Sequence, residues 1–120
     1  MKVSDLQRDC CRYYDMAFKP PKPDHLVWIS AGFYDPTQPV EGSRGALDFP
    51  LSGWVLTTPK HDGRPDSLVQ VHFHHIVEKR PDLAVYMALP PGSSFLLGSQ
   101  RDHVRFEELP PPENGLSKLA

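Results

Sequence analysis

The sequence has few of the features that mark secreted, membrane or nucleic-acid-binding proteins. Its two cysteines, Cys10 and Cys11, are adjacent, and neighbours rarely bridge because the geometry is strained. No apolar run approaches the roughly 20 residues that span a bilayer, and the charged start, residues 1–9, lacks the apolar region of a signal peptide. A net charge of −2 offers no basic face to phosphate backbones. We therefore expect a cytoplasmic protein with free thiols that binds neither membranes nor nucleic acid.

Common catalytic motifs are also missing. The chain contains no Gly-x-Ser-x-Gly, no glycine-rich phosphate loop and no Cys-x-x-Cys. Cys10 or Cys11 could act as a nucleophile with a distant histidine, but both lie on a segment with helical apolar spacing, and Cys10 belongs to its apolar stripe. This placement favours inert cysteines, so the sequence nominates no catalytic residue and no cofactor.

One cluster could carry chemistry, the segment His72-Phe73-His74-His75 followed by Glu78. His72, His74 and Glu78 have the His-x-His-(x)3-Glu spacing of a cupin's first metal motif, in which imidazoles and a carboxylate hold a divalent metal. In a helix, His72 and His75 would instead lie one turn apart. The glycines that flank the cupin motif and its later fourth histidine are absent. We therefore expect no metal and keep a metal-dependent cupin-like enzyme as an alternative.

Proline is abundant, with 14 residues, and it divides the chain into short elements. The length of 120 residues fits one domain, which we assign to residues 1–109. Residues 110–120 begin with three prolines and contain few large apolar groups, so we expect a mobile tail.

Apolar periodicity predicts an α+β fold, in which a mainly antiparallel four-stranded sheet is covered by three short helices. The first helix is expected over residues 3–18, with a capping box of Ser4 and Gln7. Its buried stripe should consist of Leu6, Cys10, Tyr13 and Tyr14. Strands are expected at 26–34, 51–58, 95–97 and 103–107, with Trp28 and Trp54 in the core, and loops at 35–46 and 60–66.

The segment that follows residue 68 fits two structures. Val69, Val71 and Phe73 alternate as in a strand, whereas Ile76 and Val77 fit only a helix. We therefore predict a short extended entry that becomes helical near His72. A further short helix is expected at 82–88, with Leu83, Tyr86 and Met87 facing inward.

Four short motifs follow one another in the second half of the chain. They are Ser52-Gly53-Trp54, His72-x-x-His75-Ile76, Tyr86-Met87-Ala88-Leu89-Pro90-Pro91-Gly92 with Phe95-Leu96, and Val104-Arg105-Phe106-Glu107 with Leu109. This ordered set, from about Gly53 to Leu109, resembles small immunity proteins of bacterial polymorphic toxin systems. Val55 stands where an aromatic residue is common, and His74 where an acidic one is frequent. The shared residues fit a core and a turn, so they identify the fold better than a binding surface.

The resemblance implies a non-catalytic protein that binds and blocks one cognate toxin. With a cytoplasmic inhibitor, the toxin would act in the cytosol, as nucleases, nucleotide-modifying enzymes and NAD-consuming enzymes do. A generic protein-interaction adaptor is a further alternative. Exposed loops carry recognition more often than scaffold does. We therefore expect contacts with the toxin at Tyr34, Asp35, Glu41, Arg44, His61, Asp62 and Arg64.

Overall fold

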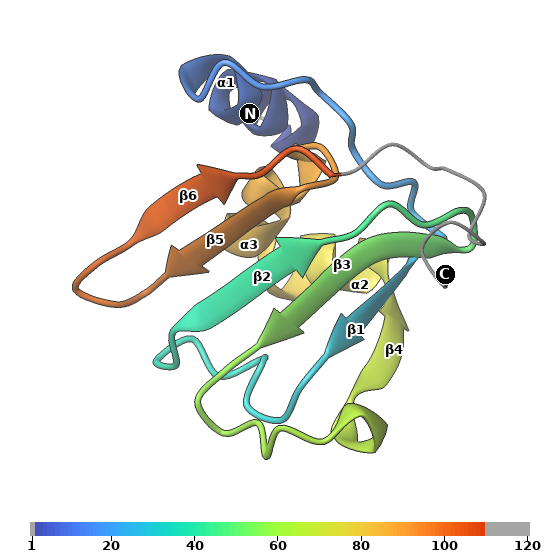
Figure 1. Ribbon diagram of the computed structural model, residues 1–120, viewed down its shortest axis with the longest axis vertical. Helices are drawn as coiled ribbons and strands as arrows, with labels where there is room; N and C mark the ends of the chain where they lie inside the picture. The colour runs from blue at the N-terminus through green and yellow to red at the C-terminus, as the bar shows by residue number, and fades with distance from the viewer. Residues whose placement is uncertain (1, 110–120) are drawn as a thin grey trace, which may run out of the picture.

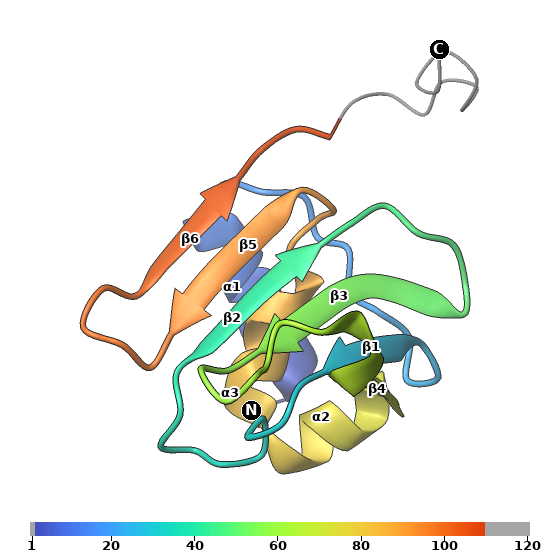
Figure 2. The same cartoon turned by 60° about the horizontal axis from the view of Figure 1, so that its bottom comes forward.

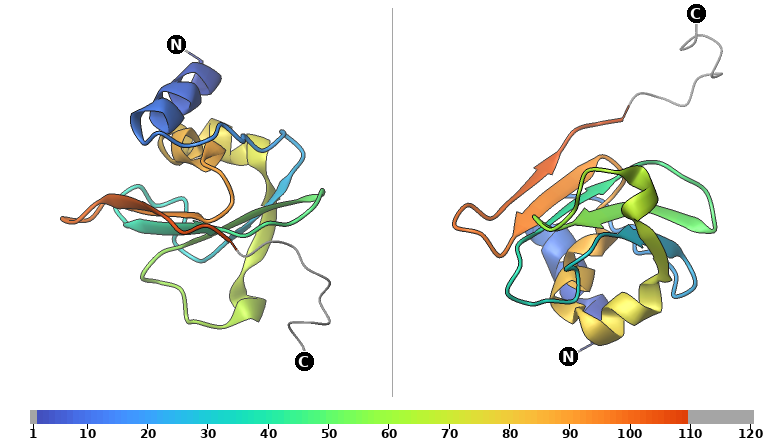
Figure 3. Two further views of the ribbon diagram at one scale, coloured as in Figure 1. Left: turned by 45° about the horizontal axis from the view of Figure 1, so that its top comes forward. Right: turned by 90° about the horizontal axis from the view of Figure 1, so that it is seen from below.

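A mixed, open sheet of six strands lies at the centre of the computed structural model, which describes residues 2–109. The expected tail at 110–120 lies outside these residues. The helices are α1 (Val3–Tyr13), α2 (Phe73–Lys79) and α3 (Pro81–Ala84), with the 3₁₀ turns η1 (Pro65–Ser67) and η2 (Val85–Ala88). The strands are β1 (Leu26–Ile29), β2 (Val40–Arg44), β3 (Leu51–Thr57), β4 (Val69–His72), β5 (Ser93–Leu97) and β6 (His103–Phe106). All three α-helices and η2 lie on one face of the sheet (Figures 1 and 3).

The strand order is β4-β1-β3-β2-β5-β6. Strands β1 and β3 are parallel, and the other neighbours are antiparallel. The expected α+β class is confirmed, and so is the extended entry that turns helical near His72, which ends β4 and caps α2. The expected four-stranded sheet was too small, because β2 was missed and β4 was read only as an entry to the helix.

Strand β2 corrects the loop expected at 35–46. Its sequence, Val-Glu-Gly-Ser-Arg, has one large apolar residue and a glycine, which is typical of a loop. The strand is held from both sides by antiparallel pairing with β3 and β5 (Figure 2). Gly42 packs beneath the ring of Phe95 and a methyl group of Leu56, where any side chain would collide. Gly42 therefore fits this central strand because the side chains of Phe95 and Leu56 already fill the space that its own side chain would occupy.

The core lies between the sheet and the helices. Its largest side chains that are under 2 % exposed include Trp54, Leu56, Phe95, Ile76, Leu83, Met87 and Leu89. The expected burial of Trp54 is confirmed, and its indole Nε1 donates a hydrogen bond to the carbonyl of Met87 at 2.8 Å. Trp28 is only half-buried, because it pairs with Val55 on the face of the sheet away from the helices. It is therefore not the core anchor that the sequence suggested.

Gly53, which precedes Trp54 in the Gly-Trp motif, shapes the backbone beside this core. Gly53 has φ +89°, and a side chain there would collide with the carbonyl of Gly45. The close approach lets the amide of Gly45 donate to the carbonyl of Gly53 at 2.9 Å. In the Gly-Trp motif, Gly53 thus allows a close backbone contact that only glycine permits, and Trp54 anchors the core.

Helix α1 differs from its expected form. It ends at Tyr13, its N-cap is Lys2, and no side chain caps it, so the expected capping box is wrong. Gln7 and Cys11 are buried, whereas Leu6 is 37 % and Tyr13 81 % exposed. Compared with the expected orientation, the helix is rotated about its axis so that Gln7 faces inward, where its Nε2 donates a hydrogen bond to the carbonyl of Ala84 at 3.0 Å. In residues 2–109, no helix is both long and apolar enough to cross a membrane.

Strand ends also differ from expectation. Strand β1 stops at Ile29 instead of residue 34, because the chain turns at Ser30 and buries Phe33 against the core. The carbonyl of Phe33 accepts a hydrogen bond from the buried guanidinium of Arg80 at 2.6 Å. At the far edge of the sheet, Phe106 in β6 is 48 % exposed rather than buried.

Candidate partner-binding surface

Three loops meet at one edge of the sheet, at the lower left of Figure 1. They are residues 30–39, 58–68 and 98–102, together called the loop edge. Parallel strands end at the same edge, so β1 and β3 deliver the first two loops side by side. Thr58 joins them, since its amide donates to Ser30 Oγ at 3.0 Å and its hydroxyl donates to the carbonyl of Ala31 at 2.6 Å.

The loop edge brings together five of the seven residues expected to contact a partner: Tyr34, Asp35, His61, Asp62 and Arg64. Tyr34 is 45 % exposed, and Arg64 is also exposed. The imidazole of His61 is largely covered, with Nδ1 3.8 Å from Asp62 Oδ1. This nitrogen has no hydrogen-bond partner among residues 2–109. His61 therefore offers less surface than its neighbours.

Each loop is held by an aspartate that accepts hydrogen bonds from its own loop. Asp35 accepts from the hydroxyl and amide of Thr37, which lower its pKa. Asp62 accepts from the hydroxyl of Ser67 at 2.7 Å and from a backbone amide, and these bonds lower its pKa. The amide of Ser99 donates to Asp102 at 2.7 Å and lowers the pKa of that carboxyl. The loop edge is therefore ordered by fixed, ionised carboxylates.

Arg44 is placed differently from its expectation as a contact residue. Its guanidinium donates from Nη1 to the carbonyls of Lys19 and Leu89, at 2.6 and 2.7 Å, and from Nε to the carbonyl of Ser52 at 3.0 Å. Burial lowers the pKa of Arg44 to about 10, so the group stays charged at neutral pH. These contacts make Arg44 a part of the scaffold. The expectation placed residue 44 in a loop, whereas it lies in a central strand.

The remaining expected contact, Glu41, lies on the face of the sheet away from the helices. It is exposed and borders a hollow of about 360 Å³ above β2, which is also lined by Ser43, Thr57, Ser94 and Arg105. The hollow exists because β2 places only Glu41 and Ser43 on this face. Sequence reasoning missed Ser94 and Arg105, since their position around the same hollow as Glu41 depends on the pairing of β5 with β2 and β6.

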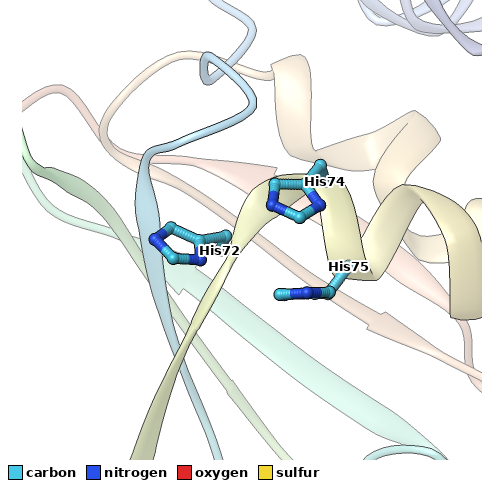
Figure 4. A group of neighbouring side chains, drawn as sticks. All are labelled: His72, His74 and His75. Carbon is cyan, nitrogen blue, oxygen red and sulfur yellow. The ribbon is translucent and has the colours of Figure 1, made fainter.

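The histidine cluster does not form the cupin arrangement. His72 ends β4, whereas His74 lies in the first turn of α2, so the two do not share one strand face, and the sheet is open. The groups that converge are His72, His74 and His75, each of which offers a ligand atom within 4.8 Å of the others (Figure 4). Glu78 lies at the side, with its carboxylate 4.0 Å from His74 Nδ1.

Comparison with known proteins identifies the family to which the chain belongs. No characterised protein and no solved structure in the comparisons matches the chain. The model of the Imm33-like domain matches residues 6–107. This match covers residues 53–107 of the segment whose motifs resemble immunity proteins, and it also covers β1 and most of α1. The chain therefore belongs to the Imm33-like domain family, a family of the immunity-protein type.

Proposed function

We propose that this protein is an immunity protein that binds one cognate toxin acting in the cytoplasm and neutralises it without catalysis. The observation that carries the proposal is the Imm33-like family match over residues 6–107. The distribution of residues supports it, because the motif residues Trp54, Ile76 and Leu89 fill the core while the expected contact residues of the loop edge lie on exposed loops. The toxin would be an enzyme with a cytosolic target, such as a nuclease or an NAD-consuming enzyme.

The proposed contact surface consists of the loop edge and the adjoining hollow above β2. Its central residues are Tyr34, Asp35, Glu41, Asp62 and Arg64. An interface of standard size buries about 800 Å² on each partner. A lethal enzyme must be held with slow dissociation, so we expect an affinity near nanomolar, about −12 kcal/mol.

Order within the loops favours such an affinity. Association loses the freedom of every side chain and loop that becomes fixed in the complex. In the loop edge, Asp35, Asp62 and Asp102 already fix their loops through hydrogen bonds, and Thr58 ties two loops together. Less freedom remains to be lost on binding, so more of the contact energy appears as affinity.

Co-expression with the toxin encoded by a neighbouring gene tests the proposal. The protein should restore growth and co-purify with the toxin. Glu41→Lys and Arg64→Glu should each weaken the complex, with little change in melting temperature, because neither side chain holds the fold. Asp24→Lys is the matched control, since Asp24 is exposed in the segment before β1, away from the loop edge.

Two results would contradict the proposal. In one, no neighbouring gene product is toxic. In the other, growth is restored without a physical complex and depends on His72 and Glu78, which would indicate an enzymatic antidote. If rescue and complex formation persist in both surface variants, the inhibitor role stands but the assigned surface is wrong.

A further inference from the structure

Three imidazoles converge where β4 passes into α2. His72 is the N-cap of α2, and its backbone is extended with φ −74° and ψ 146°. His74 and His75 follow in the first helical turn. The side chain of an N-cap residue lies over this first turn, near positions N2 and N3. The change from strand to helix therefore gathers three histidines that a continuous strand would place on opposite faces.

These rings are available for binding. The histidine rings that form hydrogen bonds within residues 2–109 are those of His25 and His103. His72 and His75 are exposed and His74 is partly exposed. The ring centroids of His74 and His75 are 4.1 Å apart, and those of His72 and His74 are 5.4 Å apart. Figure 4 shows the three rings around a common space.

We propose that His72, His74 and His75 form a binding site for one divalent transition-metal ion of the zinc type. Imidazole nitrogen is a preferred ligand of zinc, copper and nickel. Zinc–nitrogen bonds of about 2.0–2.1 Å place two ligands of a tetrahedral ion about 3.3 Å apart. The ligand atoms already lie within 4.8 Å of one another, so the widest pair must close by about 1.5 Å. Rotation of exposed side chains supplies this movement.

The third imidazole separates this site from the cupin-like alternative. His75 replaces Glu78 in the ligand set. Glu78 instead lies 4.0 Å from His74 Nδ1, where its charge favours a bound cation without coordinating it. The positive end of α2 opposes the ion only weakly, since a helix N-terminus carries about half an elementary charge at most. The proposal replaces the expectation of no metal, which rested on the incomplete cupin motif around His72, His74 and Glu78.

One coordination position remains open. A hollow of about 440 Å³ adjoins the cluster and is lined by Tyr34, His75 and Lys79. Three protein ligands with an open fourth position characterise zinc sites that accept water or an external ligand. Tyr34 lines this hollow and also belongs to the proposed toxin-contact surface, but none of the three histidines does, and zinc binding is measured on the isolated protein, so either proposal can fail without the other.

Zinc titration of the untagged, metal-free protein tests the site, with a chromophoric chelator as competitor. We expect one equivalent bound at micromolar concentration, together with shifts in the imidazole nitrogen resonances of His72, His74 and His75. Loss of an outer partner of a metal site costs roughly 10- to 100-fold in affinity. Loss of a ligand in His75→Ala should cost at least as much. Glu78→Gln should cost less than His75→Ala, and the control His103→Ala should bind as the wild type does.

The variants should fold, because the side chains of His75 and Glu78 are exposed and His103 is not fully buried. Unchanged melting temperatures without zinc would verify this. The proposal is overturned if the wild type binds no zinc at micromolar concentration, or if His75→Ala binds it equally well. It is also overturned if Glu78→Gln abolishes binding while His75→Ala does not, which would restore the cupin-like ligand set.

Discussion

Replacement of Arg44 tests whether this residue stabilises the fold or contacts a partner. Arg44→Met keeps the length and much of the apolar stem of the side chain but removes the guanidinium. In the wild-type protein this group joins β2 to the segment before β1, through Lys19, and to the end of η2, through Leu89. It also bonds the carbonyl of Ser52 in β3. The variant should therefore loosen the attachment of the helical layer to the sheet.

The magnitude follows from the carbonyls that lose their donor. Those of Ser52 and Leu89 are in partly buried hydrogen bonds, whereas the bond to Lys19 is exposed, so water can replace the donor there. A buried acceptor left unpaired costs about 1–3 kcal/mol. Because both acceptors are only partly buried, each should cost about 1–2 kcal/mol, the lower part of this range, and together they should lower the free energy of unfolding by about 2–4 kcal/mol. For a chain of this size, the melting temperature should fall by roughly 8–16 °C.

Urea denaturation followed by tryptophan fluorescence measures this loss. Arg101→Met is the matched control, because Arg101 lies exposed in the loop between β5 and β6, and its replacement should change stability by no more than about 0.5 kcal/mol. At a temperature where Arg44→Met is folded, it should bind the toxin with unchanged affinity. A variant as stable as the wild type that fails to bind would show that Arg44 is a contact residue.

Three further outcomes follow from the structure. Trp54→Ala should lower the free energy of unfolding by about 3–5 kcal/mol, as for other buried large aromatics. Trp54→Phe should lower it by at least about 1 kcal/mol, because the hydrogen bond to Met87 is lost. Equal stability of both variants and the wild type in urea would contradict the burial of Trp54. Burial raises the pKa of Asp82, but hydrogen bonds and charge from Arg80 outweigh it, and the pKa falls below 3.8. The ionised Asp82 carboxylate therefore stabilises the fold above pH 3.8, its unfolded pKa, and this stabilisation is lost as pH falls through the folded pKa. Asp82→Asn should lower the free energy of unfolding by about 1 kcal/mol at pH 7 and by less at about pH 3. A loss that does not change with pH would refute this role of Asp82. Burial, with the neighbouring cysteine, raises the pKa of Cys10 to about 11, so alkylation at about pH 8, followed by mass spectrometry, should be at least roughly tenfold slower than in the unfolded chain.

The sequence predicted elements well where local pattern and tertiary environment agree. Ile76 and Val77 fit a helix, and α2 forms there. The aspartate and glycine at 62 and 63 indicated a turn, and residues 58–68 connect β3 to β4. The expected contacts at Asp35, Asp62 and Arg64 consequently lie in loops, which local composition is sufficient to identify, whereas Tyr34 was expected at the end of a strand.

Features that depend on distant partners could not be predicted in this way. Gly42 reads as a loop residue until Phe95 and Leu56 are placed around it. The buried face of α1 depends on the carbonyl of Ala84, which Gln7 reaches across the helical layer. The missed strand explains both differences at the candidate surface, since Arg44 lies inward in β2, and Arg105 of β6 lines the same hollow as Glu41 because β5 pairs with both β2 and β6.

The central position of β2 also determines when the chain can fold. One neighbour of β2, β3, follows directly in the chain, but the other, β5, is synthesised last but one among the described strands. In α1, the side chain of Gln7 can form its hydrogen bond only when Ala84, 77 residues further along, has been synthesised. Contacts between such distant segments slow folding, since the loop must close before the contact stabilises it. An emerging chain thus has no complete core until β5 is available. Under the proposed function, protection would begin only after β5 has left the ribosome, so a cell that makes both proteins would need the inhibitor in place before the toxin.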